Sequence, residues 1–438
     1  MFAYYLDLAW HSLRRSPVLT GLMVLAIGLG IGASMTMITV LHVMTDDPLP
    51  GRSAHLYTPH LDPLPRDYHR GENSPDPSDN LTWPDAMALL KAKRAVRQAA
   101  MAGGTLLARP AQAGLQPFYA GGRYATSDIF AMFGIRFEYG GAWEPADGAS
   151  GARVVVLSDT MARKLYGRAD AVGRIAHLGE LDYRVVGVVA DWAPEPKFYA
   201  DNTGDQYGDA DTFFLPLAVA AEKDLPVNGN QSGWSRDEKE GSAKHGAAMS
   251  WLQFWVQLDT PAQVAAYRQY LVDYSAQQKA LGRFERPPTD ARLYSLMGWL
   301  VHENLVPDDV RLQLWLALGF LFVCMLNIVA LLLAKFLRRG GEISVRRALG
   351  ARRRDIFAQL AIESALVGVA GGVLGLAIAQ AGLWSVRHRP DDYARLAQMD
   401  PAMLAGTFVL AVLASVLAGL LPAWRACRIA PALQLKAQ

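Results

Sequence analysis

The sequence predicts a bundle of four transmembrane helices, with a large α+β extracytoplasmic domain between the first and the second helix. Four segments are apolar over the roughly 20 residues that a helix needs to cross a bilayer. The long region between the first two segments is polar, and strand-like and helix-like patterns alternate along it. Hydrophobic residues make up 51% of the 438 residues and charged residues 19%, a mixture typical of a chain that is part membrane protein and part soluble domain.

The apolar segments define the expected spans. The first, from Val18 to Val43, contains no formal charge, and neither does the second, from Leu312 to Ala334. The third has Glu363 as its only acidic residue. We expect spans at 17–45, 311–336, 356–386 and 401–424, an outer domain at 46–310, a short outer loop at 387–400 and a tail at 425–438.

The first span has one alternative, a secretory signal peptide. The apolar core of such a signal is about 7–15 residues long, and a small-residue cleavage site follows it. Here the apolar stretch is longer and no clean cleavage site follows. We therefore predict an uncleaved membrane anchor.

Lysine and arginine predict the orientation, because they accumulate in the cytoplasmic loops of membrane proteins. They precede the first span, fill the connector between the second and third spans, and follow the fourth. This pattern places both termini in the cytoplasm and residues 46–310 outside. In the outer loop 387–400, three arginines are offset by three aspartates. The cytoplasmic basic residues are Arg14, Arg15, Lys335, Arg338, Arg339, Arg346, Arg347, Arg352, Arg353, Arg354, Arg425, Arg428 and Lys436.

The outer domain shows clear strand and helix signals. "ARVVVLSD", "DYRVVGVVADW" and "WLQFWVQLD" read as strands bounded by turn residues. Helices are expected behind Thr82 and Thr260 as N-caps, and over Asp159–Tyr166 before Gly167.

Two long polar loops interrupt this pattern, at 193–212 and 227–250. Loops of such length are usually functional or disordered. Three aromatic residues within them are candidate contact residues: Phe198, Tyr207 and Trp234.

The connector "RRGGEISVRRALGARRRD" (338–355) is the most cationic stretch of the chain. It predicts a short amphipathic helix, because Val345 and Leu349 are four residues apart and lie on one face. Glu342 precedes Arg346 by four residues, the favourable order for an ion pair. Gly350 follows, where a helix commonly ends in the left-handed conformation. Binding to the membrane interface alone is the other interpretation of such a helix.

At this connector the sequence resembles a family. "EISVRRALGARRRDIFAQLAIES" is similar to the connector of MacB/FtsX-type ABC transporter permeases. "LDLAWHSLRRSPVLTGLMVLAIGLGIG" resembles the family's opening amphipathic helix and first span, and "LPAWRACRIAPALQLK" resembles its closing pattern. "YATSDIFAMFGIRFEYGGAW" and "ARVVVLSDTMARKLYGRADAVGRIAHLGELDYRVVGVVADW" look like its periplasmic core domain. The resemblance covers most of the chain in the family's order.

The resemblance implies further features of the architecture. Residues 1–16 would form a cytoplasmic amphipathic elbow helix, and 337–355 a coupling helix that docks on an ATPase. The outer domain would have a porter-like part at 52–112 and 250–305, with an inserted subdomain at 113–225. We expect the docking surface to consist of Glu342, Ile343, Arg346, Arg347, Leu349 and Gly350.

The third span carries two polar residues one helical turn apart, Gln359 and Glu363. Polar residues inside a membrane commonly mark functional sites. Because both lie near the cytoplasmic end of the span, we interpret them as support for the coupling region. The alternative is a polar path for a substrate.

Catalytic and metal-binding motifs are absent from the sequence. It has no phosphate-binding loop of the form G-x-x-x-x-G-K-[ST], no G-x-S-x-G or H-E-x-x-H motif, and two cysteines without CxxC spacing. The densest histidine group is His55, His60 and His69 with Asp62 and Asp67, which loop composition explains without a metal. The membrane flanks of the basic connector argue against a nucleic-acid partner.

We therefore expect a non-catalytic permease subunit in the bacterial inner membrane that exports a substrate. MacB-like proteins carry a fused ATPase ahead of the first span, whereas this chain begins at the elbow helix. A separate ABC ATPase subunit would therefore bind ATP and Mg, and this chain would hold no cofactor. The resemblance also implies a second permease chain, identical or paralogous, a periplasmic membrane-fusion protein and contact with lipid. The alternatives are an FtsX-like signalling permease that activates an extracellular partner such as a cell-wall hydrolase, and a receptor without an ATPase.

Overall fold

The computed structural model describes residues 2–68, 79–111, 114–200, 206–235, 244–306, 308–339, 341–342, 345–346, 349–388 and 401–428. The chain separates into two compact units. One, here called the helical unit, comprises residues 1–45 and 306–438, and the other, the outer unit, comprises residues 46–305.

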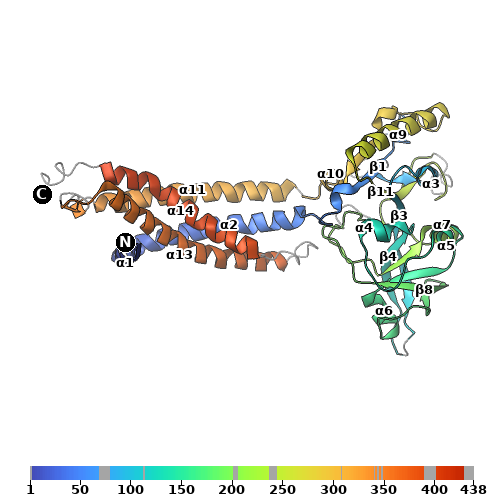
Figure 1. Cartoon of the computed structure of the whole chain (residues 1–438), viewed down its shortest axis with the longest axis horizontal. Coiled ribbons are helices and arrows are strands. Elements are labelled where there is room, and N and C mark those ends of the chain that lie inside the picture. The colour runs from blue at the N-terminus through green and yellow to red at the C-terminus, as the bar shows by residue number, and fades with distance from the viewer. Residues whose placement is uncertain are drawn as a thin grey trace. The chain divides into compact units, whose positions relative to one another are not determined.

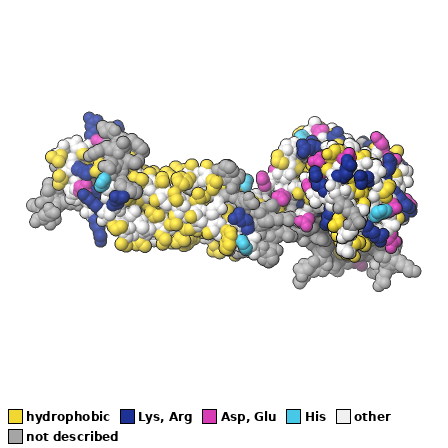
Figure 2. All heavy atoms as spheres, turned by 90° about the horizontal axis from the view of Figure 1, so that it is seen from below, with side chains coloured by type: hydrophobic (Ala, Val, Ile, Leu, Met, Phe, Trp, Pro, Cys, Tyr) yellow, Lys and Arg dark blue, Asp and Glu magenta, His cyan; other side chains and the backbone are white. Residues whose placement is uncertain are grey.

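The helical unit contains four helices that are long and apolar enough to cross a membrane. They lie side by side (Figure 1), with α2 and α14 both packed against α11 and α13. Hydrophobic side chains cover the middle of the bundle surface, and lysine and arginine side chains gather at the end drawn on the left (Figure 2). The helices of this unit are α1 (Phe2–Arg15), α2 (Pro17–Thr45), α11 (Asp308–Arg338), α13 (Arg353–Arg387) and α14 (Pro401–Arg428).

Glycines let α2 and α13 approach closely. A Cβ atom added to Gly28 would lie 2.7 Å from Leu374, and one added to Gly32 would lie 2.6 Å from Ile378 and 3.0 Å from the carbonyl oxygen of Gly375. Small residues at such positions favour helix association in lipid, where dispersion contacts replace the hydrophobic effect as the driving force. Gly28 and Gly32 therefore lie in the interface between α2 and α13.

Gly32→Ala is expected to destabilise the helical unit by about 1–3 kcal/mol, the usual cost of overpacking. The cause is the close approach of Ile378 and of the Gly375 backbone, which cannot rotate away. Gly21→Ala on the same helix is the control, because no atom lies within 4 Å of its added Cβ. Thermal unfolding in detergent measures both variants. A Gly32→Ala midpoint equal to that of Gly21→Ala would contradict the packing.

The outer unit is an α+β structure whose described strands join in one sheet. The order along the sheet is β12-β1-β11-β3-β4-β9-β6-β8-β5; β2 and β10 pair with β11, and β7 pairs with β3 and β8. The pairs β4–β9 and β6–β8 are parallel, and the other pairs are antiparallel. The strands are β1 (Leu56–His60), β2 (Leu81–Thr82), β3 (Arg97–Arg109), β4 (Phe118–Ala125), β5 (Phe137–Gly140), β6 (Val154–Ser158), β7 (Ile175–Leu178), β8 (Leu181–Val189), β9 (Phe213–Pro216), β10 (Ser232–Gly233), β11 (Met249–Gln257) and β12 (Arg292–Ser295).

Helices connect these strands and begin where the sequence predicted caps. The Thr82 hydroxyl accepts a hydrogen bond from the Asp85 N–H, and the Thr260 hydroxyl accepts one from Gln263 in a complete capping box. Ser158 caps the helix that ends at left-handed Gly167, as expected. The helices are η1 (Ser53–His55), α3 (Trp83–Ala92), α4 (Asp128–Phe133), α5 (Pro145–Ala149), α6 (Asp159–Tyr166), α7 (Leu217–Glu222), α9 (Pro261–Ala280), η3 (Pro288–Asp290) and α10 (Leu296–His302).

The order of the strands can be compared with the two parts that the resemblance implied for the outer domain, the porter-like part and the inserted subdomain. Strands from 52–112 and 250–305 occupy one end of the order, from β12 to β3, and strands from 113–225 occupy the other, from β4 to β5. The sheet is continuous between them through the β3–β4 pair. The boundaries of the two parts therefore stay predictions.

Two aromatic residues of the polar loop 193–212 do not lie where a contact surface would place them. Phe198 and Tyr207 are buried, so the sequence interpretation of both as contact residues was wrong. Phe198 packs edge to face against Phe133 and Trp255, with ring centroids 4.9 and 5.0 Å apart. The reason is physical: a polar stretch can still anchor itself by burying its few large apolar side chains.

Candidate functional site

The connector between α11 and α13 forms the helix stop that its sequence predicts. Glu342, Val345 and Arg346 are helical. The Leu349 N–H donates to the Val345 carbonyl at 3.0 Å, and the Ala351 N–H reaches back to the Arg346 carbonyl at 3.0 Å. Gly350 between them has φ = +100°. This is the pattern of a helix end closed by a left-handed glycine. The predicted docking residues Ile343 and Arg347 lie outside the described residues.

Connector side chains bind the ends of both flanking helices. Glu342 accepts from Arg346 at 2.7 Å, the expected i,i+4 pair, and from Arg339, the residue directly after α11, at 3.1 Å. Arg346 also donates to the Gln359 amide oxygen on α13 at 3.1 Å. Because one carboxylate and one guanidinium each make contacts in two directions, the connector is joined to α11 and to α13 together.

Glu363 lies at the centre of a second, buried set of contacts. Its carboxylate is fully buried; Oε1 lies 2.6 Å from Lys335 Nζ, and Oε2 lies 3.2 Å from Arg339 Nη1. The Ser12 hydroxyl on α1 donates to Glu363 Oε1 at 2.6 Å and accepts from Arg339 Nη1 at 2.6 Å. Within the described residues Lys335 makes no aligned hydrogen bond, so its contact with Glu363 is an ion pair.

Arg339 joins the two sets, because it contacts Glu342 and Glu363 at once. We call these seven residues the connector network: Ser12, Lys335, Arg339, Glu342, Arg346, Gln359 and Glu363. It carries three cations and two carboxylates and ties α1, α11, α13 and the connector to one another. The Glu363 carboxylate is removed from water and persists as a charge only while Lys335 and Arg339 pair with it. A shift of Arg339 with the connector is therefore resisted by α13, which carries Glu363.

The connector network is closely packed. The space enclosed beside Arg339, Glu342, Arg346 and Gln359 is about 10 Å³, at the lower limit of what a water molecule needs. A substrate path needs a larger opening. The packing therefore favours the interpretation of Gln359 and Glu363 as supports of the connector, although their function stays a prediction.

Among the described residues of the connector, two apolar side chains lie on the surface. Leu349 is 83% exposed and Val345 is 50% exposed. Exposed arginines flank them, among them Arg352 and Arg354. An apolar pair rimmed by cations is suited to contact with an acidic, partly apolar surface.

Three members of the connector network were missed as site residues from the sequence: Ser12, Lys335 and Arg339. Lys335 and Arg339 were taken as orientation signals only. The signal that could have found them is Glu363 itself, because a carboxylate within an apolar span requires a cation from a neighbouring helix. Nothing in the local sequence of Ser12 indicates its role.

A second buried ion cluster, in the outer unit, was also missed. Arg123 Nε donates to Asp211 Oδ2 at 2.9 Å, Lys197 Nζ lies 3.4 Å from Asp211 Oδ1, and all three side chains are buried. Arg123 also lies over the Tyr199 ring, 4.5 Å from its centroid. Burial raises the pKa of Asp211, but the charges of Arg123 and Lys197 outweigh it and hold that pKa below its ordinary value of 3.8.

The histidine group considered from the sequence does not form a ligand set in the described ranges. No three histidine, cysteine or carboxylate side chains gather there as metal ligands. His60 packs instead against Trp299, with ring centroids 4.6 Å apart, and His55 lies 3.7 Å from Asp259. His69 is outside the described residues.

Two family models match the chain. The model of the MacB-like periplasmic core domain matches residues 20–274, more than half of the chain, and the model of the FtsX-like permease C-terminal region matches residues 315–431. The second match contains the connector network apart from Ser12.

The curated proteins that are similar to this chain include several that are named as export proteins. The macrolide export ATP-binding/permease protein MacB of Escherichia coli is 23% identical over 97% of this chain and 59% of its own length. MacB of a Shewanella species is 24% identical over 69% of this chain and 41% of its own length. The pyoverdine export ATP-binding/permease protein PvdT of Pseudomonas entomophila is 26% identical over 81% of this chain and 48% of its own length. The chain thus spans about half the length of the curated relatives it matches.

Solved structures of similar proteins include the periplasmic region of MacB from Actinobacillus actinomycetemcomitans, at 15% identity, with a TM-score of 0.36 over 57% of this chain and 92% of the other. The extracellular domain of the transporter YknZ from Gram-positive bacteria aligns at 16% identity, with a TM-score of 0.33 over 50% of this chain and 95% of that domain. The family models, which together run from the first long helix to the last, decide the assignment: the chain belongs to the MacB/FtsX-type family of ABC transporter permeases.

Proposed function

We propose that this chain is the permease subunit of an exporter in which a separate ABC ATPase docks on the connector. The observation that carries the proposal is the connector network. Arg339, in the connector directly after α11, pairs with Glu363 on α13, which also pairs with Lys335 on α11, and Arg346 donates a hydrogen bond to the Gln359 amide on α13. A force applied to the connector therefore acts on both helices, because moving Arg339 alone would take a counter-charge from the buried Glu363.

In the proposed mechanism the ATPase closes on ATP and pulls the connector. The helices α11 and α13 carry this motion to the outer unit, and the outer unit moves the substrate. The tight packing of the connector network supports transmission of motion at this point, not passage of a substrate through it. The chain has no phosphate-binding loop, so its residues do not fit ATP by that route.

The proposed location is the bacterial inner membrane, with the connector and both termini in the cytoplasm and the outer unit in the periplasm. The gathering of lysine and arginine at one end of the bundle supports this orientation. The proposed assembly has two permease chains, identical or paralogous, two ATPase subunits that bind ATP and Mg, and a membrane-fusion protein in the periplasm. The match to the MacB-like periplasmic core domain favours export over FtsX-like signalling.

Val345→Asp with Leu349→Asp is expected to abolish binding of the ATPase. Both apolar side chains are exposed in the described part of the connector, and acidic groups there would be desolvated against the partner. The control is Leu281→Asp, which introduces the same charge at a side chain that is 67% exposed in the outer unit. Affinity purification of the tagged full chain from its own cells, with an ATPase assay of the eluate, measures the effect.

The expected result is an ATPase that copurifies with the wild type and with Leu281→Asp but not with the double variant. The thermal midpoint of the double variant should match the wild type, because neither side chain is buried. Copurification and hydrolysis that survive the double substitution would show that docking occurs elsewhere. A wild-type chain that brings down no ATPase would overturn the proposed function.

A further inference from the structure

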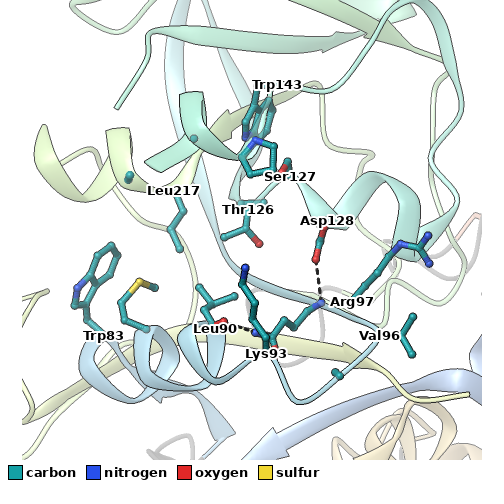
Figure 3. A pocket seen from close by; sticks show the side chains of 17 residues that line it. Trp83, Leu90, Lys93, Val96, Arg97, Thr126, Ser127, Asp128, Trp143 and Leu217 are labelled. Atoms are coloured by element: carbon teal, nitrogen blue, oxygen red, sulfur yellow. Dashed lines mark hydrogen bonds between the residues drawn. The ribbon is translucent and has the colours of Figure 1, made fainter. Parts of the chain in front are cut away.

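The outer unit contains a cavity that none of the sequence motifs indicated. Its volume is about 620 Å³, within the range of about 300–1,000 Å³ that is usual for small-molecule sites. Helix α3 and the start of β3 form one side, and the start of α4, the α5 region and α7 form the others (Figure 3). The apolar lining side chains are Trp83, Met87, Leu90, Val96, Trp143 and Leu217.

Three residues that line this cavity carry buried polar atoms without a hydrogen-bond partner in the described part of the chain. They are the Trp143 indole nitrogen, the Gln98 amide oxygen and the Thr126 hydroxyl oxygen. Trp143 and Gln98 are both more than nine-tenths buried. Native proteins leave few buried polar groups unpaired. These three atoms have almost no accessible surface, so they add polarity behind the wall of the cavity and do not themselves contact an occupant.

Lys93 lines the same cavity in an unfavourable backbone conformation. It ends α3 with φ = 49° and ψ = 48°, a left-handed position where glycine is usual and where other residues are strained. Its side chain extends from the α3 side toward the centre of the lining residues (Figure 3). Among the described residues no carboxylate pairs with it. Strain of this kind persists only where the surrounding structure holds the backbone in place, and such positions cluster at functional sites.

The charges around the cavity add to a positive sum. Arg97 lines the wall and donates to the neutral Gln257 amide at 2.9 Å. Asp128 is the one carboxylate among the lining residues, and it accepts from the Gln98 N–H at 3.2 Å. Two cations and one carboxylate give the wall a net charge of +1, and Lys93, which is exposed, can exchange water for an anionic occupant.

We infer that this cavity binds an amphiphilic organic anion: an apolar body against Trp83, Met87 and Leu90, with one carboxylate that pairs with Lys93. The apolar lining accommodates the body, since aromatic side chains offer large flat contact surfaces. The unpaired ammonium fixes the orientation through a charge-assisted hydrogen bond. The ligand class follows from the cavity alone.

The role of the site rests on the proposed function: the cavity is where the outer unit holds the molecule that the exporter moves. Binding itself needs no ATPase. A chain that binds the anion without capturing an ATPase would contradict the exporter and leave the site intact, and the reverse result would contradict the site alone.

The test uses the full chain in lipid nanodiscs and three probes of one shape. Naphthalene-2-carboxylate is the anion, naphthalene-2-carboxamide the neutral control and naphthalen-2-ylmethylammonium the cation. Equilibrium dialysis against empty nanodiscs removes partitioning into lipid. The carboxylate is expected to bind saturably and about tenfold more tightly than the carboxamide, as one charge-assisted contact predicts. The ammonium probe is expected to show no saturable binding.

Three variants locate the binding. Lys93→Gly removes the cation and relieves the left-handed strain, so the carboxylate should bind no more tightly than the carboxamide while the thermal midpoint stays the same or rises. Lys91→Gln is the matched control, because Lys91 is exposed on the same helix and does not line the cavity. Ala218→Trp fills the cavity from α7 and should abolish binding of both probes.

Equal binding of the carboxylate by Lys93→Gly and Lys91→Gln would overturn the inference, as would binding that survives Ala218→Trp in a folded chain. Carboxylate binding no greater than in empty nanodiscs would overturn it as well. If Ala218→Trp does not fold, the comparison of the two lysine variants decides, because the glycine variant is expected to be at least as stable as the wild type.

Discussion

Glu363→Gln is expected to destabilise the helical unit by about 3–5 kcal/mol, the usual cost of removing one partner of a buried ion pair. The carboxylate is 0% exposed, and it faces Lys335, which is 4% exposed, at 2.6 Å. Glutamine keeps the shape of the side chain and removes the charge. Lys335 is then left buried without a counter-charge, and Arg339 loses one of its two carboxylates.

The measurement is thermal unfolding of the full chain in detergent, followed by intrinsic tryptophan fluorescence. At about 2–4 °C per kcal/mol for a unit of this size, the midpoint should fall by on the order of 10 °C. Lys335→Met in the Glu363→Gln background should recover part of the loss, because it removes the stranded ammonium. Glu342→Gln is the control for a partly exposed partner, because the Glu342 side chain is 35% exposed and its ion pairs are expected to contribute about 0–1 kcal/mol.

A Glu363→Gln midpoint within 1–2 °C of the wild type, a shift of about 0.5 kcal/mol or less, would contradict the buried ion pair. Recovery by Lys335→Met separates loss of charge balance from loss of packing, since both substitutions keep roughly the original volume. The recovered variant also tests the coupling hypothesis. It should remain folded and yet lose stimulation of the ATPase, because α13 no longer shares a charge with α11.

Asp211→Asn is expected to destabilise the outer unit by about 3–5 kcal/mol for the same physical reason. The substitution leaves Arg123 and Lys197 buried near one another without a carboxylate between them. Loss of the contact also frees the segment that holds Tyr199, whose ring lies 4.5 Å from the Arg123 guanidinium carbon. Asp170→Asn is the control, because the Arg168–Asp170 pair is about half exposed and 3.7 Å long.

The pH dependence of the wild type gives an independent measure of the same cluster. The pKa of Asp211 in the folded chain is below 3.8, because Arg123 and Lys197 outweigh the effect of burial. A depressed pKa contributes stability above the unfolded value, and this stability is lost as the pH falls through the folded value. The difference in unfolding free energy between wild type and Asp211→Asn should therefore be constant from neutral pH down to about 3.8 and shrink below it.

Chemical unfolding of the two proteins at several pH values, followed by fluorescence of the outer-unit tryptophans, measures this difference. A difference that shrinks well above pH 3.8 would show that the Asp211 pKa is not depressed. A difference that does not change at any pH would show that Asp211 is not the titrating group.

The family and the four apolar helices followed from the sequence, because both depend on local signals. A span is a run of about 20 apolar residues. The alternation of a strand, or a hydroxyl cap such as Thr82 or Thr260, can be recognised from a few neighbouring residues. The end of the connector helix at Gly350 was predicted for the same reason, because only the nearest residues decide whether a helix stops there. The Glu342–Arg346 ion pair was predictable for the same reason, because the two residues are four apart on one helix.

What only the tertiary structure decided is which distant charges meet. Ser12 and Glu363 are 351 residues apart in the chain, and Arg123 and Asp211 are 88 apart; no periodicity relates them. The cavity beside Lys93 is assembled from separate helices and strands in the same way. Local sequence determines each element, because its hydrogen bonds close within a few residues. Pairing of buried charges depends on how the elements pack, because a buried ion takes whichever counter-charge the folded chain brings within about 4 Å.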